Sequence, residues 1–143
     1  MRYVEKTYLA LVDGKPPTPA GRVEAYIGRD LKNRKRMAIV SQSKGREAVS
    51  EYKTLESFKS HTLLEVHPFT GRTHQIRLHC AFLKCPIVGD EVYGRKNSTL
   101  DLDRHFLHAY RLKIILPGEK EPRLFEAPLP DELEQALINL RKG

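Results

Sequence analysis

The apolar residues of this 143-residue chain change their spacing once, and that change constrains the fold more than any other feature. Before residue 67, apolar side chains occur in short runs or at alternate positions, as in half-buried strands, over residues 7–12, 21–27, 37–40, 48–56 and 62–66. From Ile76 to Leu83 they recur three and four positions apart, which is the period of a helix, and Pro86 closes the segment. The pattern predicts a β-meander followed by a helix.

The second half of the chain predicts a hairpin and another helix. Residues 107–116 alternate as a strand does, Pro117 and Gly118 end that strand, and residues 124–127 can pair with it. Residues 130–140 open with Pro130 and acidic side chains, and their apolar residues share one helical face. We therefore expect an α+β chain, and the length favours a single domain over residues 1–143.

Positive charge is concentrated in one segment. The formal net charge is +7, and residues 29–46 alone carry +6, with Arg34, Lys35 and Arg36 in a row. Such a local cluster suits binding to phosphates, as in nucleic acid, although a solvated loop is the simpler alternative.

Composition also bears on the compartment. No apolar run is long enough to cross a bilayer, and the first residues do not read as a secretory signal, so a cytoplasmic protein is expected. The two cysteines, Cys80 and Cys85, are predicted to share one helix and its exit, which favours reduced buried thiols over a disulfide or a structural zinc site.

The stretch HPFTGRTHQIRLH, residues 67–79, combines histidines and arginines at the predicted strand-to-helix junction. His74 and His79 lie about 140° apart on a helix, which is wrong for a zinc-binding pair. No nucleophile elbow and no glycine-rich nucleotide loop occurs in the chain. The sequence therefore disfavours a hydrolase, a metal site and a nucleotide-binding loop.

The two arginines of this stretch remain. The turn around Arg72 can enter the helix with Thr70 or Thr73 as its N-cap, and it offers a phosphate or backbone contact. Arg77 flanks the buried helix face, where a guanidinium needs an acidic partner. From the chemistry alone, both could equally be ordinary solvated arginines.

At these residues the chain resembles the RluA-type RNA pseudouridine synthases. The resemblance rests on Gly-Arg-Thr-His-Gln-Ile-Arg-Leu-His at residues 71–79, Pro-Ile-Val-Gly-Asp at 86–90 and Tyr93-Gly94. It extends to Lys-Thr-Tyr-Leu-Ala at residues 6–10, to the segments at 34–37 and 45–52, to His108-Ala109, and to Ala-Pro-Leu-Pro at 127–130.

The resemblance implies an isomerase that converts uridine to pseudouridine in structured RNA, ribosomal or transfer, without a metal or an organic cofactor. It implies a mixed, largely antiparallel sheet with flanking helices, split by a cleft. Tyr8 would stack on the target base, and Ile87 or Val88 would form the apolar wall behind it. Arg77 would pair with the catalytic aspartate, and Arg34, Lys35, Arg36, Arg72 and His74 would contact RNA.

One element of the family pattern does not occur in this chain. The family carries its catalytic aspartate in a His-Arg-Leu-Asp block upstream of the tyrosine strand, and no such block is found in these 143 residues. We therefore expect only the C-terminal part of a catalytic domain, with the N-terminal half of the fold missing. Arg77 would lack its acidic partner, Asp90 would have a structural role, and the chain alone would be inactive.

Two other functions stay open. The chain could be a non-catalytic RNA-binding module that keeps the fold. It could also associate with itself, because missing strands would leave sheet edges exposed.

Overall fold

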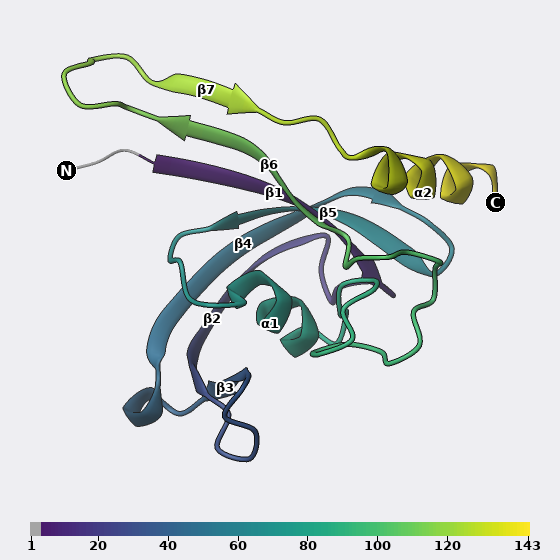
Figure 1. Ribbon diagram of the computed structural model, residues 1–143, viewed down its shortest axis with the longest axis horizontal. Coiled ribbons are helices and arrows are strands. Elements are labelled where there is room, and N and C mark those ends of the chain that lie inside the picture. The colour runs from purple at the N-terminus through teal and green to yellow at the C-terminus, as the bar shows by residue number, and fades with distance from the viewer. Residues whose placement is uncertain (1–3) are drawn as a thin grey trace.

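The computed structural model describes residues 4–143 and arranges seven strands in one strongly twisted sheet with a helix on each face (Figure 1). Residues 1–3, which the expected domain includes, lie outside the described residues. The strands are β1 (Val4–Asp13), β2 (Ala20–Arg29), β3 (Met37–Val40), β4 (Arg46–Ser57), β5 (His61–Pro68), β6 (Leu107–Ile114) and β7 (Arg123–Glu126). The helices are α1 (Gln75–Phe82), α2 (Asp131–Lys142) and a short 3-10 turn, η1 (Gln42–Lys44). Every segment expected as a strand or helix is one.

The order of the strands differs from a simple meander. It runs β3-β2-β4-β5-β1-β6-β7, and each of these neighbouring pairs is antiparallel. β1 does not pair with β2, as a meander requires, but lies between β5 and β6. The local pattern could not show this, because the proline-containing loop at residues 14–19 carries the chain away to a separate hairpin.

Alternate residues of the central strands pack against different helices. Ala10 and Leu64 belong to the core under α1, which also contains Ile76 and Cys80. Their neighbours Leu11 and Leu63 belong to the core under α2, with Leu133 and Leu137. Each fully buried leucine contributes about 1.5–3 kcal/mol. β1 is therefore apolar on both faces, because each face is covered by a helix.

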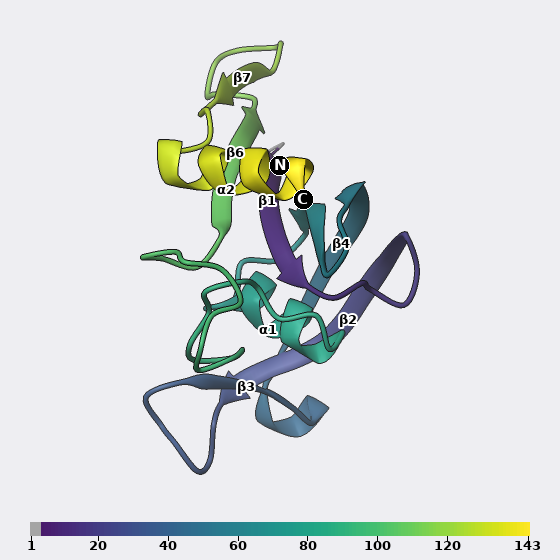
Figure 2. The same cartoon turned by 90° about the vertical axis from the view of Figure 1, so that its right-hand side faces the viewer.

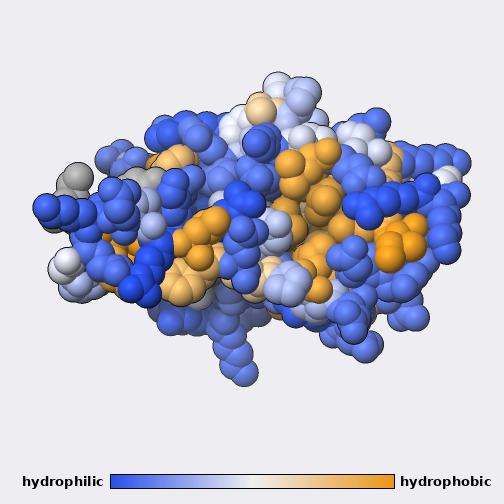
Figure 3. All heavy atoms as spheres, turned by 90° about the horizontal axis from the view of Figure 1, so that it is seen from above, coloured by the Kyte–Doolittle hydropathy of each residue, from blue (hydrophilic) through white to orange (hydrophobic). Residues whose placement is uncertain are grey.

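Different elements lie at the two ends of the sheet. β6 and β7 extend from one end, and β3 lies at the other, together with the loop at residues 30–36, here called the basic loop (Figure 2). From the side of β6, β7 and α2 the surface is mainly hydrophilic with separate apolar patches (Figure 3). Neither helix in residues 4–143 is long and apolar enough to span a membrane.

Candidate active site

A cavity of about 380 Å³ opens between the start of β1, the start of β6 and the turn that joins β5 to α1. β1 contributes Lys6 and Tyr8, and the turn and α1 contribute most of residues 68–77. His105 and Leu107 close the far side. No Asp or Glu is among the described residues that form this wall, so the charges that line the cavity, from Lys6, Arg72 and Arg77, are all positive.

Arg77 binds an acidic partner just behind this wall. Its Nε and Nη2 donate to Asp90 Oδ2 and Oδ1, each over 2.9 Å. The Asp90 side chain is 1% exposed and that of Arg77 is 14% exposed. The expectation that Arg77 lacks an acidic partner in this chain is therefore wrong, whereas the structural role expected for Asp90 fits its position.

The backbone before Asp90 is what brings the carboxylate under Arg77. Gly89 has a φ of 84°, and a Cβ there would lie 2.6 Å from the carbonyl oxygen of Arg104. Only glycine fits that close approach in a left-handed conformation. Asp90 Oδ1 then accepts the N–H groups of Val92 and Tyr93, both over 3.1 Å.

These contacts fix the charges of the pair. Burial disfavours an ionised Asp90, but the hydrogen bonds from Arg77 and from the two backbone N–H groups outweigh it and lower the pKa of Asp90. The hydrogen bond to Asp90 in turn raises the pKa of Arg77. Asp90 is thus a fully engaged, buried carboxylate and not a free nucleophile.

Arg77 nevertheless keeps part of its hydrogen-bonding capacity. The pair with Asp90 uses the N–H of Nε and one N–H of Nη2. Nη1 has no acceptor among residues 4–143. Because Arg77 also lines the cavity, a second anion can bind to the remaining edge. The guanidinium lies 5.1 Å from the centre of the Tyr93 ring, which further limits its motion.

His74 begins α1 in an unusual conformation. It has a φ of 59° and makes no side-chain cap, so neither Thr70 nor Thr73 is the N-cap that the sequence suggested. Its Nδ1 lies 2.8 Å from the hydroxyl of Tyr93. Burial and then the positive charge of Arg77 lower the pKa of His74.

Gln75 explains why Thr70 does not cap the helix. Thr70 Oγ1 donates to Gln75 Oε1 over 2.6 Å and accepts the N–H of Val49. Gln75 Nε2 donates to the carbonyl of Val49 and to Ser50 Oγ, both over 2.9 Å. These bonds fasten the turn to β4 and form the floor of the cavity.

The structure brings four of the expected site residues to the cavity and places the others elsewhere. Tyr8, Arg72, His74 and Arg77 line it. Ile87 and Val88 do not: they are buried in the two separate cores, 1% and 0% exposed. The aliphatic side chains in the wall are instead those of Pro68, Ile76 and Leu107. The strand-like path of residues 87–88 against β1 turns them inward.

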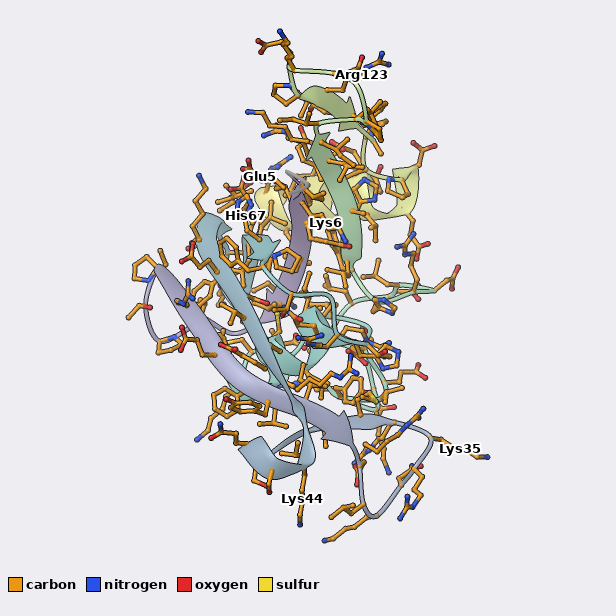
Figure 4. The ribbon with its side chains drawn as sticks, turned by 90° about the vertical axis from the view of Figure 1, so that its left-hand side faces the viewer. Glu5, Lys6, Lys35, Lys44, His67 and Arg123 are labelled. Carbon is orange, nitrogen blue, oxygen red and sulfur yellow. The ribbon has the colours of Figure 1, made fainter. Side chains whose placement is uncertain are left out.

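The basic residues at 34–36, which were expected to contact RNA, lie in the loop between β2 and β3. Arg34 and Lys35 are exposed, and Lys35 and Lys44 extend into solvent at the end of the molecule away from Arg123 (Figure 4). Arg36 is partly engaged, because its Nε donates to Asp30 Oδ2 over 2.9 Å. Its Nη1 also donates to the carbonyl of Val92 over 3.3 Å, which links the loop to the Asp90 segment.

Three cavity residues were not expected at the site. Leu107 belongs to an ordinary strand pattern, and His105 follows a polar stretch without periodicity. Lys6 stands in the family-like block at residues 6–10, but the sequence indicated no role for it. Asp90 and Tyr93 were visible within the motif at residues 86–94, but their contacts with Arg77 depend on tertiary structure. Within residues 4–143, no group of three or more His, Cys, Asp or Glu side chains is placed to hold a metal ion.

Comparison with known proteins agrees with this arrangement. Residues 1–82 match the family described as RNA pseudouridylate synthase. The chain is 47% identical over 140 residues to a protein of Chloroflexus aurantiacus named an uncharacterized RNA pseudouridine synthase, covering 98% of this chain and 43% of that protein. It is 39% identical to a protein of Borreliella burgdorferi named ribosomal large subunit pseudouridine synthase D, covering 96% of this chain and 42% of the other.

Solved structures are similar as well. The structure titled human RNA pseudouridylate synthase domain containing 4 superimposes with a TM-score of 0.77 at 29% identity, covering 96% of this chain and 62% of that one. The chain spans less than half the length of the two curated relatives. The match to the family over residues 1–82, with the similar sequences and structures, shows that this chain belongs to the RNA pseudouridylate synthase family.

Proposed function

We propose that the cavity binds the target uridine of a structured RNA and that the complete enzyme converts this uridine to pseudouridine. In that reaction the bond between N1 of uracil and C1′ breaks, a bond between C5 and C1′ forms, the proton on C5 passes to solvent, and N1 takes up a proton from solvent, so that no atoms are gained or lost overall. The observation that carries the proposal is a cavity with an arginine edge available and an aromatic ring beside it, but with no carboxylate.

Each cavity residue has a role in the proposal. Tyr8 is half-buried, and its ring can replace the stacking that a flipped base loses. The free edge of Arg77 holds a catalytic carboxylate ionised, so that the carboxylate can act on the nucleotide. Arg72 and His74 at the mouth, with Arg34, Lys35 and Arg36 farther out, contact the RNA backbone.

The carboxylate itself comes, in this proposal, from a part of the fold that this chain does not span. Support comes from the share of the relatives that the chain covers and from the engaged state of Asp90. Residues 1–143 would then form one structural unit that completes a larger catalytic domain. On this basis the chain alone has no synthase activity.

A chimera tests the proposal. This chain replaces the matching segment of the Chloroflexus aurantiacus relative, and tritium release is measured from ribosomal and transfer RNA that contain 5-tritiated uridine. The chimera is expected to release tritium and the chain alone is not. Release by the chain alone, at a rate like that of the chimera, would contradict the proposed origin of the carboxylate.

The same experiment distinguishes the class of RNA substrate and tests the alternative of a non-catalytic module. Release from only one of the two RNAs identifies the substrate class, ribosomal or transfer RNA, and either would be met in the cytoplasm. A chimera that folds by circular dichroism and binds RNA, yet releases no tritium, would favour a non-catalytic RNA-binding module. The absence of a carboxylate from the cavity wall is the observation that keeps this second function in view.

Self-association is a separate proposal, carried by the edge strand β7. All four residues of β7 are exposed, and Leu124 and Phe125 are 53% and 49% exposed. Unpaired backbone groups beside apolar side chains favour pairing with another strand.

A further inference from the structure

The hydroxyl of Tyr93 lies between two partners that together determine how its single proton is used. Met37 N–H points to Tyr93 Oη over 3.0 Å, and His74 Nδ1 lies 2.8 Å from the same oxygen. A backbone N–H can only donate, so Tyr93 Oη accepts from Met37. Its own proton is then available for His74 Nδ1, which is the nearest acceptor within residues 4–143.

That arrangement specifies the tautomer of His74. If Nδ1 accepts the Tyr93 proton, the ring is neutral and its hydrogen resides on Nε2. The opposite assignment would leave the hydroxyl proton of Tyr93 without a partner among the described residues. The edge-on packing of the two rings, with centroids 5.5 Å apart, holds the imidazole in this orientation.

The charged neighbours of His74 also favour a neutral ring. The positive charge of Arg77 on α1 opposes a charged His74, and the same guanidinium packs on the Tyr93 ring. His105, just before β6, lies on the far side of the cavity, and the basic loop ends next to Met37. Asp90 is the acidic group that acts on His74, and both of its oxygens are bonded to Arg77.

The backbone of His74 is strained in a way that a mere helix start does not require. A left-handed conformation is costly for a residue with a Cβ, and glycine or asparagine would adopt it more easily. Strain of this kind persists at binding and switch sites, where surrounding contacts hold the residue in place. Here the ring of His74 lines the cavity while its Nδ1 edge is turned to Tyr93.

We propose that Tyr93 is a positioning residue that fixes His74 as a neutral donor, with its Nε2–H directed into the cavity toward an acceptor oxygen of the bound nucleotide. That Nε2–H faces a nucleotide, here called the ligand half of the inference, rests on the proposed function. The tautomer of His74 does not. The oxygen belongs to a uracil carbonyl or to a phosphate, and a neutral donor can serve either without adding charge beside Arg77. Because Tyr93 also holds Met37, the basic loop and this donor are positioned by one side chain.

The tautomer is measured by long-range proton–nitrogen NMR of the histidine rings in the nitrogen-15-labelled chain at pH 7. The expected wild-type spectrum shows His74 with a protonated Nε2 and an unprotonated Nδ1. Tyr93→Phe is expected to abolish this single tautomer, whereas Tyr110→Phe, which removes a hydroxyl from a ring that also packs on an arginine, leaves it unchanged. A wild-type ring that is charged, or protonated on Nδ1, would overturn the proposal without any variant.

Titration with uridine, uridine 5′-monophosphate and inorganic phosphate tests the ligand half. A shift of His74 Nε2 with uridine assigns the uracil carbonyl, and a shift with inorganic phosphate assigns a phosphate oxygen. Shifts at Tyr8 and Lys6 without any at His74 would overturn the donor role while leaving the cavity as the nucleotide site. No shift at any cavity residue with the monophosphate would contradict both the donor role and the proposed function.

Discussion

Arg77 and Asp90 form a side-on pair with two hydrogen bonds of 2.9 Å, and the carboxylate is sealed from solvent beneath the cavity. A buried pair of this kind is costly to break, since removing one partner leaves the other charged and uncompensated. The pair also orients the guanidinium before any substrate or second carboxylate arrives. Preorganisation of this kind is what a catalytic site needs, because reorientation during the reaction would add to the barrier.

Asp90→Asn tests how much this pair contributes to the stability of the fold. The amide keeps the shape of the side chain but cannot neutralise Arg77, so the free energy of unfolding should fall by about 3–5 kcal/mol. Urea unfolding of the chain measures the change. Glu56→Gln is the matched control, because Arg141 grips Glu56 in the same side-on manner on the surface, and it should move the midpoint far less. Equal losses for the two variants would contradict the buried pair.

His79 gives the fold a dependence on pH. Its ring is 2% exposed, and burial lowers its pKa from 6.5 to about 4. The unfolded chain therefore binds more protons than the folded chain between those values, so stability is complete above pH 6.5 and is lost as the pH falls toward 4. The loss due to His79 is roughly 3 kcal/mol, and the lowered pKa values of His74 and His105 act in the same direction.

Urea midpoints at pH 7.5 and pH 5 measure this effect. His79→Asn preserves an acceptor for Ser50 and should flatten the pH dependence. His108 on β6 is hydrogen-bonded to the carbonyl of Ala127. His108→Gln is the control and should leave the pH dependence intact. A wild-type chain equally stable at the two pH values would contradict the prediction.

The basic loop should dominate the salt dependence of RNA binding. Replacing Arg34, Lys35 and Arg36 by glutamine removes up to three phosphate contacts, so the slope of log affinity against log salt should decrease in magnitude by about 2–3. The control variant replaces Lys120, Arg123 and Lys142 by glutamine. These exposed residues lie in the β6–β7 turn, in β7 and in α2, away from the basic loop, so the variant removes the same charge elsewhere. Filter binding of a transfer RNA between low and moderate salt gives both slopes. The prediction fails if the two triple variants lose the same slope.

Edge pairing through β7 predicts self-association in solution. Sedimentation velocity should show a sedimentation coefficient that rises with protein concentration, and Leu124→Lys should suppress the rise because an edge lysine opposes strand addition. Replacement of the exposed Leu31, which lies in the loop before β3, provides the control. A monomer at every concentration would exclude this mode of association.

Periodicity alone predicted the elements well, because alternation and helical spacing are local consequences of which faces are buried. The order of strands was not predictable in this way: β1 pairs with β5 and β6 through contacts with residues 48 or more positions away in the chain. The N-cap was also missed, since Thr70 is an ordinary cap residue whose hydroxyl is used instead by Gln75.

At the site, residue chemistry predicted that Arg77 needs an acid but not which acid provides it. The family pattern drew attention to an aspartate outside this sequence, whereas the close backbone approach at Gly89 brings Asp90 within reach. Ile87 and Val88 were expected in the base pocket because they stand in the motif. Their strand-like pairing with β1 turns both side chains into the cores.

The central claim is that Arg77, already oriented by Asp90, holds a second carboxylate during catalysis. Tritium release from 5-tritiated uridine in RNA by the chimera carrying Arg77→Lys tests it most directly, with Arg72→Lys as the matched cavity control. Lysine cannot bind two carboxylates through separate edges, so Arg77→Lys should reduce the rate by about 100-fold or more, and Arg72→Lys much less. An undiminished rate in the folded Arg77→Lys chimera would contradict the account.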